Sequence, residues 1–215
     1  MRKWKKESKA KAVIIDLLNT CHVGRLGTVG KDGYPMVKPL NFAYNPPESP
    51  HTPLWKRDNP PKSPFNKGGL EGDFQGEQGG FGKIYFHTAK EGEKIEDIKR
   101  DNRVCFEVDL PIAYVKGTAA DPCKAEYLYR SVIIKGKAYI VEDKDERIFG
   151  LKCLMQKYQP EGGYGDFLEE KLQITGIVRI NIEEMVGKED LGKDKLKETT
   201  LKALEKKVQL PIVLE

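Results

Sequence analysis

The segment "YFHTAKEGEK" carries polar residues at the point where a predicted strand gives way to a predicted helix. His87 and Thr88 end the strand, and Gly92 and Lys94 begin the helix. The first turn of a helix offers free N–H groups and the positive end of the helix dipole, so it attracts anions. An ammonium group and a hydroxyl group beside those N–H groups complete the chemistry of a phosphate pocket.

Two acidic residues flank this anion site and leave a second interpretation open. Glu91 and Glu93 favour the start of any helix, because carboxylates are stabilised near its N-terminus. The segment is then an ordinary strand-to-helix turn, with Lys94 in solvent. The local residues alone favour this second interpretation.

Two further β-prone segments carry polar residues that are typical of ligand sites. In "PMVKPLNFAY", Pro39 and Asn41 are unusual in a strand, and an inward-pointing amide needs a partner. Lys38, on the other face, is expected to be solvated. "YLYRSVIIKG" opens with Arg130 and Ser131, which could present a guanidinium and a hydroxyl at a barrel mouth. A polar strand start explains this second pair equally well.

Metal-dependent and hydrolytic chemistry lack their usual patterns in this chain. The three histidines are dispersed, no HExxH motif is present, and the four cysteines form no CxxC pair. No GxSxG nucleophile elbow occurs. We therefore predict no metal site and four reduced thiols.

The composition and length are typical of one globular domain. The chain has 215 residues, of which 39% are hydrophobic, and its net charge of +4 comes from scattered basic residues rather than a basic face. No apolar run approaches the roughly 18 residues that span a bilayer, and no secretory h-region follows the basic start. We expect a cytoplasmic protein that binds neither nucleic acid nor membrane.

Hydrophobic periodicity predicts more strands than helices. The strands occur in adjacent antiparallel-type runs, which favours a mainly β fold, a small barrel with helices packed outside. Gly136 interrupts one strand, where a bulge or sharp bend is predicted. Besides two strands around the turn "GKDG", the predicted strands are 83–89, 103–110, 129–143 and 174–188, and the predicted helices are 7–21, 91–102, 143–158 and 194–208.

Residues 46–82 differ from the rest of the single domain, 1–215. They contain seven Pro and seven Gly among 37 residues, against 20 among the other 178. Such a segment cannot bury enough surface to fold by itself. It resembles a translated DNA repeat element, with "NPPKSPFNKGG" as the distinctive part, and we interpret it as an inserted loop; a lid over a site is the alternative. Residues 188–215 are expected to form a peripheral C-terminal helix.

Four short motifs in order resemble those of a known family. These are "PLNF", "YFH" followed by G-x-K, "VCFEVD" and "YRSV". Together they resemble the flavin-nucleotide-binding proteins related to pyridoxamine 5'-phosphate oxidase, specifically the branch that contains the nitroimidazole-resistance proteins. The likeness runs from about residue 10 to residue 187 with the insertion removed.

This resemblance implies a fold, a cofactor and an assembly. The fold would be an antiparallel FMN-binding split β-barrel, and the assembly a homodimer that holds FMN at its subunit interface. Four consecutive strand residues would lie along the isoalloxazine ring: Pro39, Leu40, Asn41 and Phe42.

The resemblance also implies roles for the polar segments. His87 and Thr88 would contact the flavin and the ribityl phosphate, and Lys94 would bind the phosphate. Ser131, with Arg130 near it, would reach the flavin from the other subunit. These residues turn the strand-to-helix segment into a predicted FMN site.

Two departures from the oxidases narrow the predicted activity. Glu93 stands where the oxidases place the arginine of an Arg-Lys pair at the phosphate. Their C-terminal Trp and Arg have no clear counterpart here, apart from a possible role for Arg179. The resemblance therefore does not extend to true pyridoxamine phosphate oxidase activity.

The predicted function is that of an FMN-dependent oxidoreductase. It would reduce a small planar acceptor such as a nitro compound, with NADH or NADPH as electron donor, and the flavin would supply most of the chemistry. His87 is the predicted catalytic group. Two alternatives remain: a protein of the same fold that stores or senses flavin, haem or deazaflavin without turnover, and a structural dimer whose pocket the insertion disturbs.

Overall fold

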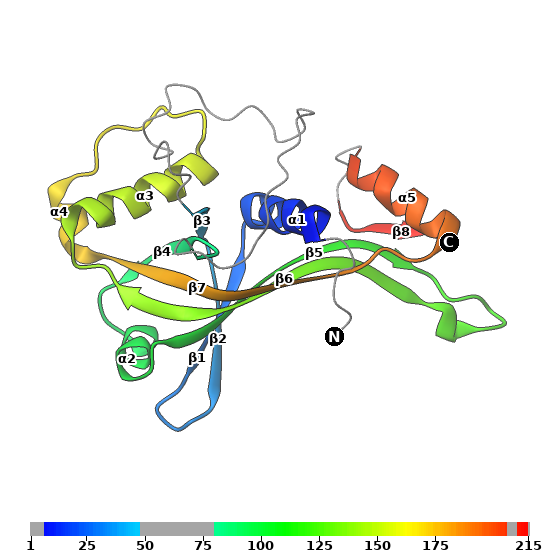
Figure 1. The fold of residues 1–215 in the computed structure, drawn as a ribbon, viewed down its shortest axis with the longest axis horizontal. Helices are drawn as coiled ribbons and strands as arrows, with labels where there is room; N and C mark the ends of the chain where they lie inside the picture. Colours follow the sequence, from blue (N-terminus) through cyan, green and yellow to red (C-terminus); the bar gives the residue numbers. More distant parts are fainter. Residues whose placement is uncertain (1–6, 48–79, 206–209, 215) are drawn as a thin grey trace.

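The computed structural model describes residues 7–47, 80–205 and 210–214 (Figure 1). Its strands are β1 (Gly24–Val29), β2 (Pro35–Leu40), β3 (Ala43–Asn45), β4 (Lys83–Ala89), β5 (Arg103–Val115), β6 (Glu126–Ile140), β7 (Thr175–Asp190) and β8 (Ile212–Leu214). Its α-helices are α1 (Glu7–Thr20), α2 (Glu93–Arg100), α3 (Lys144–Tyr158), α4 (Glu169–Ile174) and α5 (Asp194–Glu205).

A single eight-stranded sheet organises the described residues. Seven strands follow the order β2-β1-β5-β6-β7-β4-β3, and β8 pairs with β5 beside this path. The seven strands pair antiparallel, whereas β8 runs parallel to β5. The prediction of a mainly β, antiparallel fold with flanking helices is confirmed.

The main hydrophobic core lies on the inner side of the sheet. Strand β1 alternates buried and exposed residues, as a half-buried strand does. Helices α1 and α2 add apolar side chains to the same core. Burial of each such side chain contributes about 1.5 to 3 kcal/mol. Core members include Leu17 and Leu18 of α1, Ile95 and Ile98 of α2, and Phe86, Phe106, Val132 and Ile134 of the sheet.

Gly136 marks a bulge in the pairing of β6 with β7, as predicted. The register shifts between Lys135 and Gly136. A Cβ atom added to Gly136 would lie 2.2 Å from the carbonyl oxygen of Asn181, so a side chain there would push the two strands apart. The bulge therefore requires glycine at this position.

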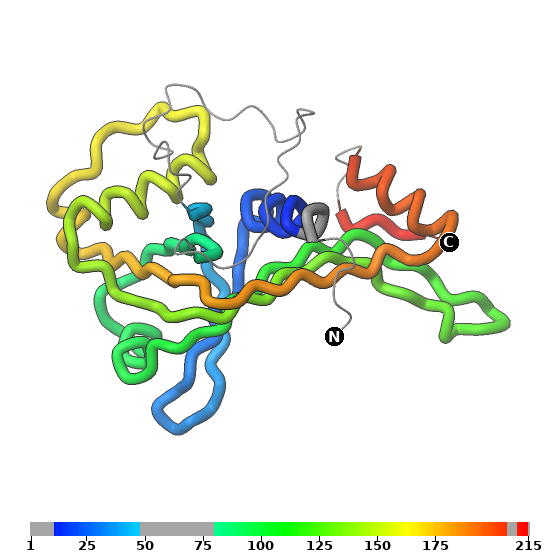
Figure 2. The backbone as a smooth tube through the Cα atoms, viewed as in Figure 1, coloured from blue at the N-terminus to red at the C-terminus, as the bar shows by residue number. Residues whose placement is uncertain are grey.

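The helices lie on both sides of the long strands (Figure 2). In the view of Figure 1, α1, α3 and α5 lie above the long strands, and α2 lies below them. Helix α3 covers a second cluster, formed by Tyr85, Val141 and Ile177 with partly buried Phe149 and Leu151. No helix of the described residues is long and apolar enough to cross a membrane.

Beyond the barrel, β5 and β6 continue as an arm, and β8 pairs with β5 along its edge. Helix α5 and strand β8 pack on this arm around a third cluster of Ile112, Ala113, Leu128 and Leu191. The predicted C-terminal region thus contains the helix α5 and also a strand, β8, which the sequence pattern did not reveal because it has only three residues.

The predicted insertion 46–82 falls mostly outside the described residues. The structure describes 46–47 and 80–82, and residues 48–79 lie outside it. The flanking strands β3 and β4 pair directly, with Asn45 opposite Lys83. Gly82 has φ of 91°, and a Cβ there would lie 2.5 Å from the Asn45 carbonyl oxygen. Glycine is therefore needed where the chain re-enters the sheet.

Candidate functional site

Within the described residues, the sheet does not close between β2, which pairs with β1, and β4, which pairs with β3; we call this unpaired opening the gap. Strand β3 pairs with β4 up to Ala43 opposite Tyr85. The same register would place Asn41 opposite His87, but Asn41 and Phe42 belong to no strand. The tertiary fold therefore brings "PLNF" and "YFHT" to the two sides of one gap within a single chain.

Helix α2 begins at this gap with an uncapped N-terminus. Gly92 precedes it with φ of 117°, a conformation that side chains rarely adopt, and a Cβ there would meet no atom within 4 Å. Its carbonyl accepts the first helical hydrogen bonds, from Ile95 N–H at 2.9 Å and Glu96 N–H at 3.1 Å. No side chain caps the helix, so its dipole end is available to an anion.

One ion pair and a second ammonium group lie at the start of α2. Lys38 Nζ lies 2.5 Å from a carboxylate oxygen of Glu93, so the prediction that Lys38 is solvated is wrong. Lys38 pairs with core residue Leu26 and therefore points inward with it. Lys94 Nζ lies 5.4 Å from the Phe86 ring centroid. Burial, and then the charge of Lys38, lower the pKa of Lys94.

His87 and Thr88 point to opposite sides of β4. Adjacent strand residues alternate in direction, and His87 is exposed whereas Thr88 is half-buried. Thr88 therefore shares the side of Phe86, over which Lys94 lies. A ligand that touches both His87 and Lys94 must cross the end of β4.

The segment 39–42 presents backbone as well as side chains to the gap. Pro39 is exposed, and Leu40 and Asn41 are half-buried. Phe42 is completely buried, with its ring centroid 5.0 Å from that of Phe106. A planar ligand beside this segment would therefore meet the backbone of Phe42 rather than its ring.

Arg130 and Ser131 lie far from His87 along β7 within one chain. Ser131 stands opposite Lys188 of β7 and His87 opposite Ile177, a separation of eleven residues along β7, or about 35 Å at roughly 3.3 Å per residue. Arg130 Nε donates to Glu189 at 3.2 Å. The single chain does not unite these two residues with His87 and Lys94.

A cluster that sequence reasoning missed connects Pro39 with Ser131. The strand partner of Pro39 is Arg25, whose guanidinium binds Glu107 at 3.0 Å and also binds Asp109. Asp109 stands opposite Ser131. Alternation in "GRLG" and "FEVD" predicts exposed side chains, but only the strand register shows that they meet.

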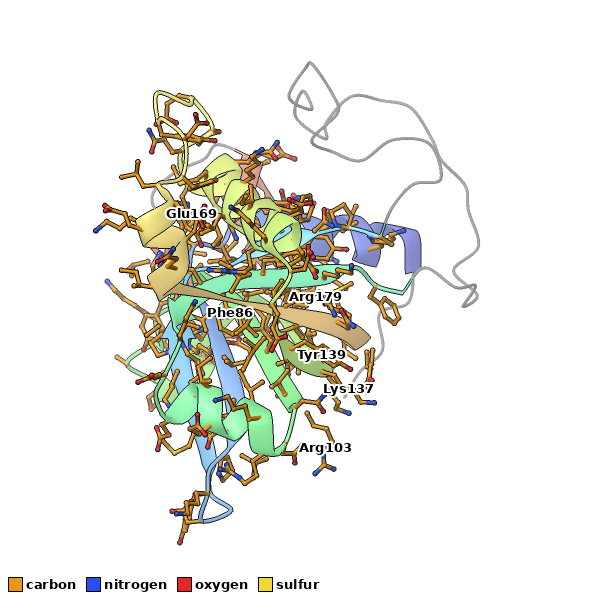
Figure 3. The ribbon with its side chains drawn as sticks, turned by 90° about the vertical axis from the view of Figure 1, so that its left-hand side faces the viewer. Phe86, Arg103, Lys137, Tyr139, Glu169 and Arg179 are labelled. Carbon is orange, nitrogen blue, oxygen red and sulfur yellow. The ribbon has the colours of Figure 1, made fainter. Side chains whose placement is uncertain are left out.

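A second missed cluster lies beneath α3 (Figure 3). Arg179 Nη1 binds both carboxylate oxygens of Glu146, at 2.7 and 2.8 Å, and the Tyr85 hydroxyl donates to Glu146 at 2.9 Å. Tyr139 packs beside Arg179, whose guanidinium carbon lies 5.3 Å from the centroid of the Tyr139 ring. Burial alone would raise the pKa of Glu146, but the bonds from Arg179 and Tyr85 lower it overall. Arg179, the residue considered above as a counterpart of the oxidases' C-terminal arginine, is thus paired with Glu146.

Two surface cavities lie apart from the gap. One, of about 380 Å³, lies at the C-terminal end of α2 and is lined by 98–102 and 138–140. The other, of about 420 Å³, lies between α3 and the loop that carries Tyr164 and Phe167. Neither cavity is lined by Lys94 or His87. The gap is the candidate site because of its positive charge and the uncapped N-terminus of α2. Among the described residues, no group of three His, Cys, Asp or Glu side chains could hold a metal ion.

The sequence match establishes the family. The family model for pyridoxamine 5'-phosphate oxidase matches residues 10–189, which include the whole path from β1 to β6 and nearly all of β7. The chain belongs to the pyridoxamine 5'-phosphate oxidase family. Its sheet is the split β-barrel of this family, and the predicted resemblance is confirmed. No curated protein sequence matches the chain.

Several solved structures share the fold of this chain. A protein assigned to 5-nitroimidazole antibiotic resistance, from Bacteroides thetaiotaomicron, is 18% identical, with 86% of this chain and 84% of that chain covered and a TM-score of 0.58. The FAD and heme binding protein of Mycobacterium smegmatis is 15% identical, with coverages of 94% and 80% and a TM-score of 0.60. A flavocytochrome from Azotobacter vinelandii is 16% identical, with coverages of 87% and 72% and a TM-score of 0.58.

Proposed function

We propose that this protein binds FMN in the gap between β2 and β4 and acts as an oxidoreductase toward a small planar acceptor. The observation that carries the proposal is the meeting of Lys38 and Lys94 at the uncapped N-terminus of α2. Burial, and then the charge of Lys38, lower the pKa of Lys94, and an anion there would favour its charged form. The phosphate of FMN is such an anion, and the planar flavin ring attached to it could serve the oxidation after which the family is named.

The residues at the gap fit a phosphate group. Lys94 would be its main cation, and the Thr88 hydroxyl lies on the same side of β4. Lys38 neutralises Glu93, which stands where the oxidases have an arginine. Lys38, Lys94 and Glu93 together carry a net charge of +1, and Glu96 of the first turn pairs with Lys99. These cations and the free N–H groups would hold an anion.

The ring of the flavin would lie along the segment 39–42. Pro39, Leu40 and Asn41 would supply its contacts, with the backbone of Phe42. His87 would be the polar group nearest the ring or the acceptor, because it points to the exposed side of β4. When bound, FMN supplies hydride transfer, and these residues orient it and exclude water.

Arg130 and Ser131 would come from a second copy of the chain. They lie about 35 Å along β7 from His87, and a second copy could bring them to the same ring as His87. In a homodimer, two copies would provide two equivalent sites. NADH or NADPH would be the electron donor, and a nitro compound is one acceptor of the right shape.

Three measurements test this proposal. Titration of the purified, cofactor-stripped protein with FMN should quench flavin fluorescence and raise the melting temperature, and sedimentation should report a dimer. The absorption spectrum of the protein as isolated separates flavin from haem or deazaflavin. A protein that neither quenches FMN nor gains thermal stability from it would refute the proposal.

Turnover is tested separately from binding. The FMN-loaded protein should be reduced under anaerobic conditions by NADH or NADPH and reoxidised by a nitroaromatic compound. FMN binding without reduction by either nucleotide would instead identify a flavin carrier of the same fold.

A further inference from the structure

Phe42 obtains its backbone hydrogen bonds from a side chain instead of a strand. Its N–H donates to the Tyr158 hydroxyl at 3.0 Å. The same hydroxyl lies 2.5 Å from the His22 carbonyl oxygen and 3.2 Å from the Phe42 carbonyl oxygen. A hydroxyl has one proton, and the closer His22 carbonyl is its better acceptor. The Tyr158 hydroxyl thus connects α3 with the chain at His22 and at Phe42.

The neighbouring residue on α3 holds the ring of Phe42. Lys157 Nζ lies 3.5 Å from the Phe42 ring centroid and donates to the Leu18 carbonyl at 2.9 Å. That carbonyl belongs to the last turn of α1, where a cation is favoured. The His22 ring packs edge-on against the Tyr158 ring, with centroids 5.6 Å apart. Ring and backbone of Phe42 are therefore both held from the end of α3.

The hydroxyl also sets the direction of the preceding peptide. The Phe42 N–H and the Asn41 carbonyl belong to one planar peptide unit, in which they point in opposite directions. Holding the N–H at Tyr158 therefore aims the Asn41 carbonyl away from α3. Without this bond, a buried N–H would lack a partner and the peptide would turn to find one.

We propose that Tyr158 is a positioning residue for the flavin-facing segment Pro39–Phe42, and that its hydroxyl replaces the strand partner which Phe42 loses at the split of the barrel. The flavin part of this inference rests on the proposed function. Tyr158 itself need not touch the ligand, because it acts through the peptide between Asn41 and Phe42.

The test compares two Tyr→Phe variants that each remove one hydroxyl. Tyr158→Phe keeps the volume of the side chain and removes the bond to Phe42. Tyr44→Phe is the matched control, because the Tyr44 hydroxyl donates to the Phe81 carbonyl at 2.9 Å, in the neighbouring strand pair. Circular dichroism in the far ultraviolet confirms that both variants are folded.

The first readout needs no flavin. Hydrogen exchange of the Phe42 amide in the flavin-free protein should be on the order of tenfold faster in Tyr158→Phe, and unchanged in Tyr44→Phe. The same exchange rate in wild type and Tyr158→Phe would overturn the inference, whatever the protein binds.

The second readout reports the placement of the ring. In Tyr158→Phe, the visible circular dichroism of bound FMN should change and the Kd for FMN should rise on the order of tenfold. Faster exchange with unchanged dichroism and Kd would overturn the positioning role and leave a purely structural one. Failure of the wild-type protein to bind FMN would refute the proposed function, while the exchange result would still decide whether Tyr158 holds Phe42.

Discussion

The gap at α2 and the cluster beneath α3 use positive charge in opposite ways. At the gap, Lys38 pairs with the carboxylate of Glu93, and burial and then the charge of Lys38 lower the pKa of Lys94. Beneath α3, Arg179 is matched by both oxygens of Glu146, whose pKa falls. A matched cation stabilises the fold, whereas an excess of cations at an open helix end prepares a site for an anion.

The largest effect should come from the matched pair. Glu146→Gln removes the ionic partner of Arg179 in a half-buried place and should lower the free energy of unfolding by about 2 to 3 kcal/mol. Because the folded pKa of Glu146 is lowered, this contribution is present above its ordinary pKa of 4.5 and is lost as pH falls through the folded pKa. Urea unfolding at pH 7 and pH 3 measures it.

The comparison also predicts what Glu146→Gln leaves unchanged. Affinity for FMN should stay within twofold of wild type. Glu169→Gln is the control, because the ion pair of Glu169 with Lys144 is exposed and contributes about 0 to 1 kcal/mol. Equal losses of stability in the two variants would contradict the structural role of the Arg179 pair.

Lys94→Ala should show the opposite pattern. FMN binding should weaken by about 1.5 to 3 kcal/mol, because a charge-assisted hydrogen bond to phosphate is lost. The melting temperature of the flavin-free protein should hardly change. Lys99→Ala, on the exposed side of the same helix and paired with Glu96, is the matched control in the fluorescence titration. Unaltered affinity in Lys94→Ala would place the phosphate elsewhere.

Lys157 should make stability depend on pH in the alkaline range. Burial lowers its pKa to about 8, from 10.5. Between these values the unfolded chain binds a proton that the folded protein does not, so stability rises with pH from about 8 to 10.5.

Lys157→Met should remove this rise, an effect of about 2 kcal/mol after discounting the partial exposure of the side chain, since one pKa unit corresponds to about 1.4 kcal/mol. Denaturant unfolding at pH 7.5 and pH 10.5 measures the difference from wild type. Exposed Lys152 on the same helix is the control. The same pH dependence in wild type and Lys157→Met would show that Lys157 is not desolvated.

The smallest effect should come from the partly exposed pair of Lys38 with Glu93. Glu93→Gln frees an ammonium group and should tighten FMN binding by about 0.5 to 1 kcal/mol, and Lys38→Met should weaken it by a similar amount. A double-mutant cycle gives their coupling. If Glu93→Gln weakened binding, the carboxylate would itself contact the ligand and the charge argument would fail.

Periodicity and turn residues determined much of the architecture in advance. Alternation such as that of "RVCFEVDL" predicts a half-buried strand, and Gly136 predicts the bulge between β6 and β7, because both depend on neighbouring residues. The parts of the anion site are also close in sequence, since Thr88, Gly92 and Lys94 lie within seven residues of one another. Residue types alone therefore yielded the mainly β architecture and the parts of a phosphate pocket, and the family resemblance favoured that pocket over an ordinary strand-to-helix turn.

Only the tertiary structure decided which side chains meet. Lys38 and Glu93 are separated by 55 positions, and Tyr158 and Phe42 by 116, so no periodic pattern connects them. Strand register paired Arg25 with Pro39, and the docking of α3 paired Arg179 with Glu146. Register and helix docking depend on the packing of the whole core, and for that reason the balance of charge at the gap and the bond that holds Phe42 could not be predicted from the sequence.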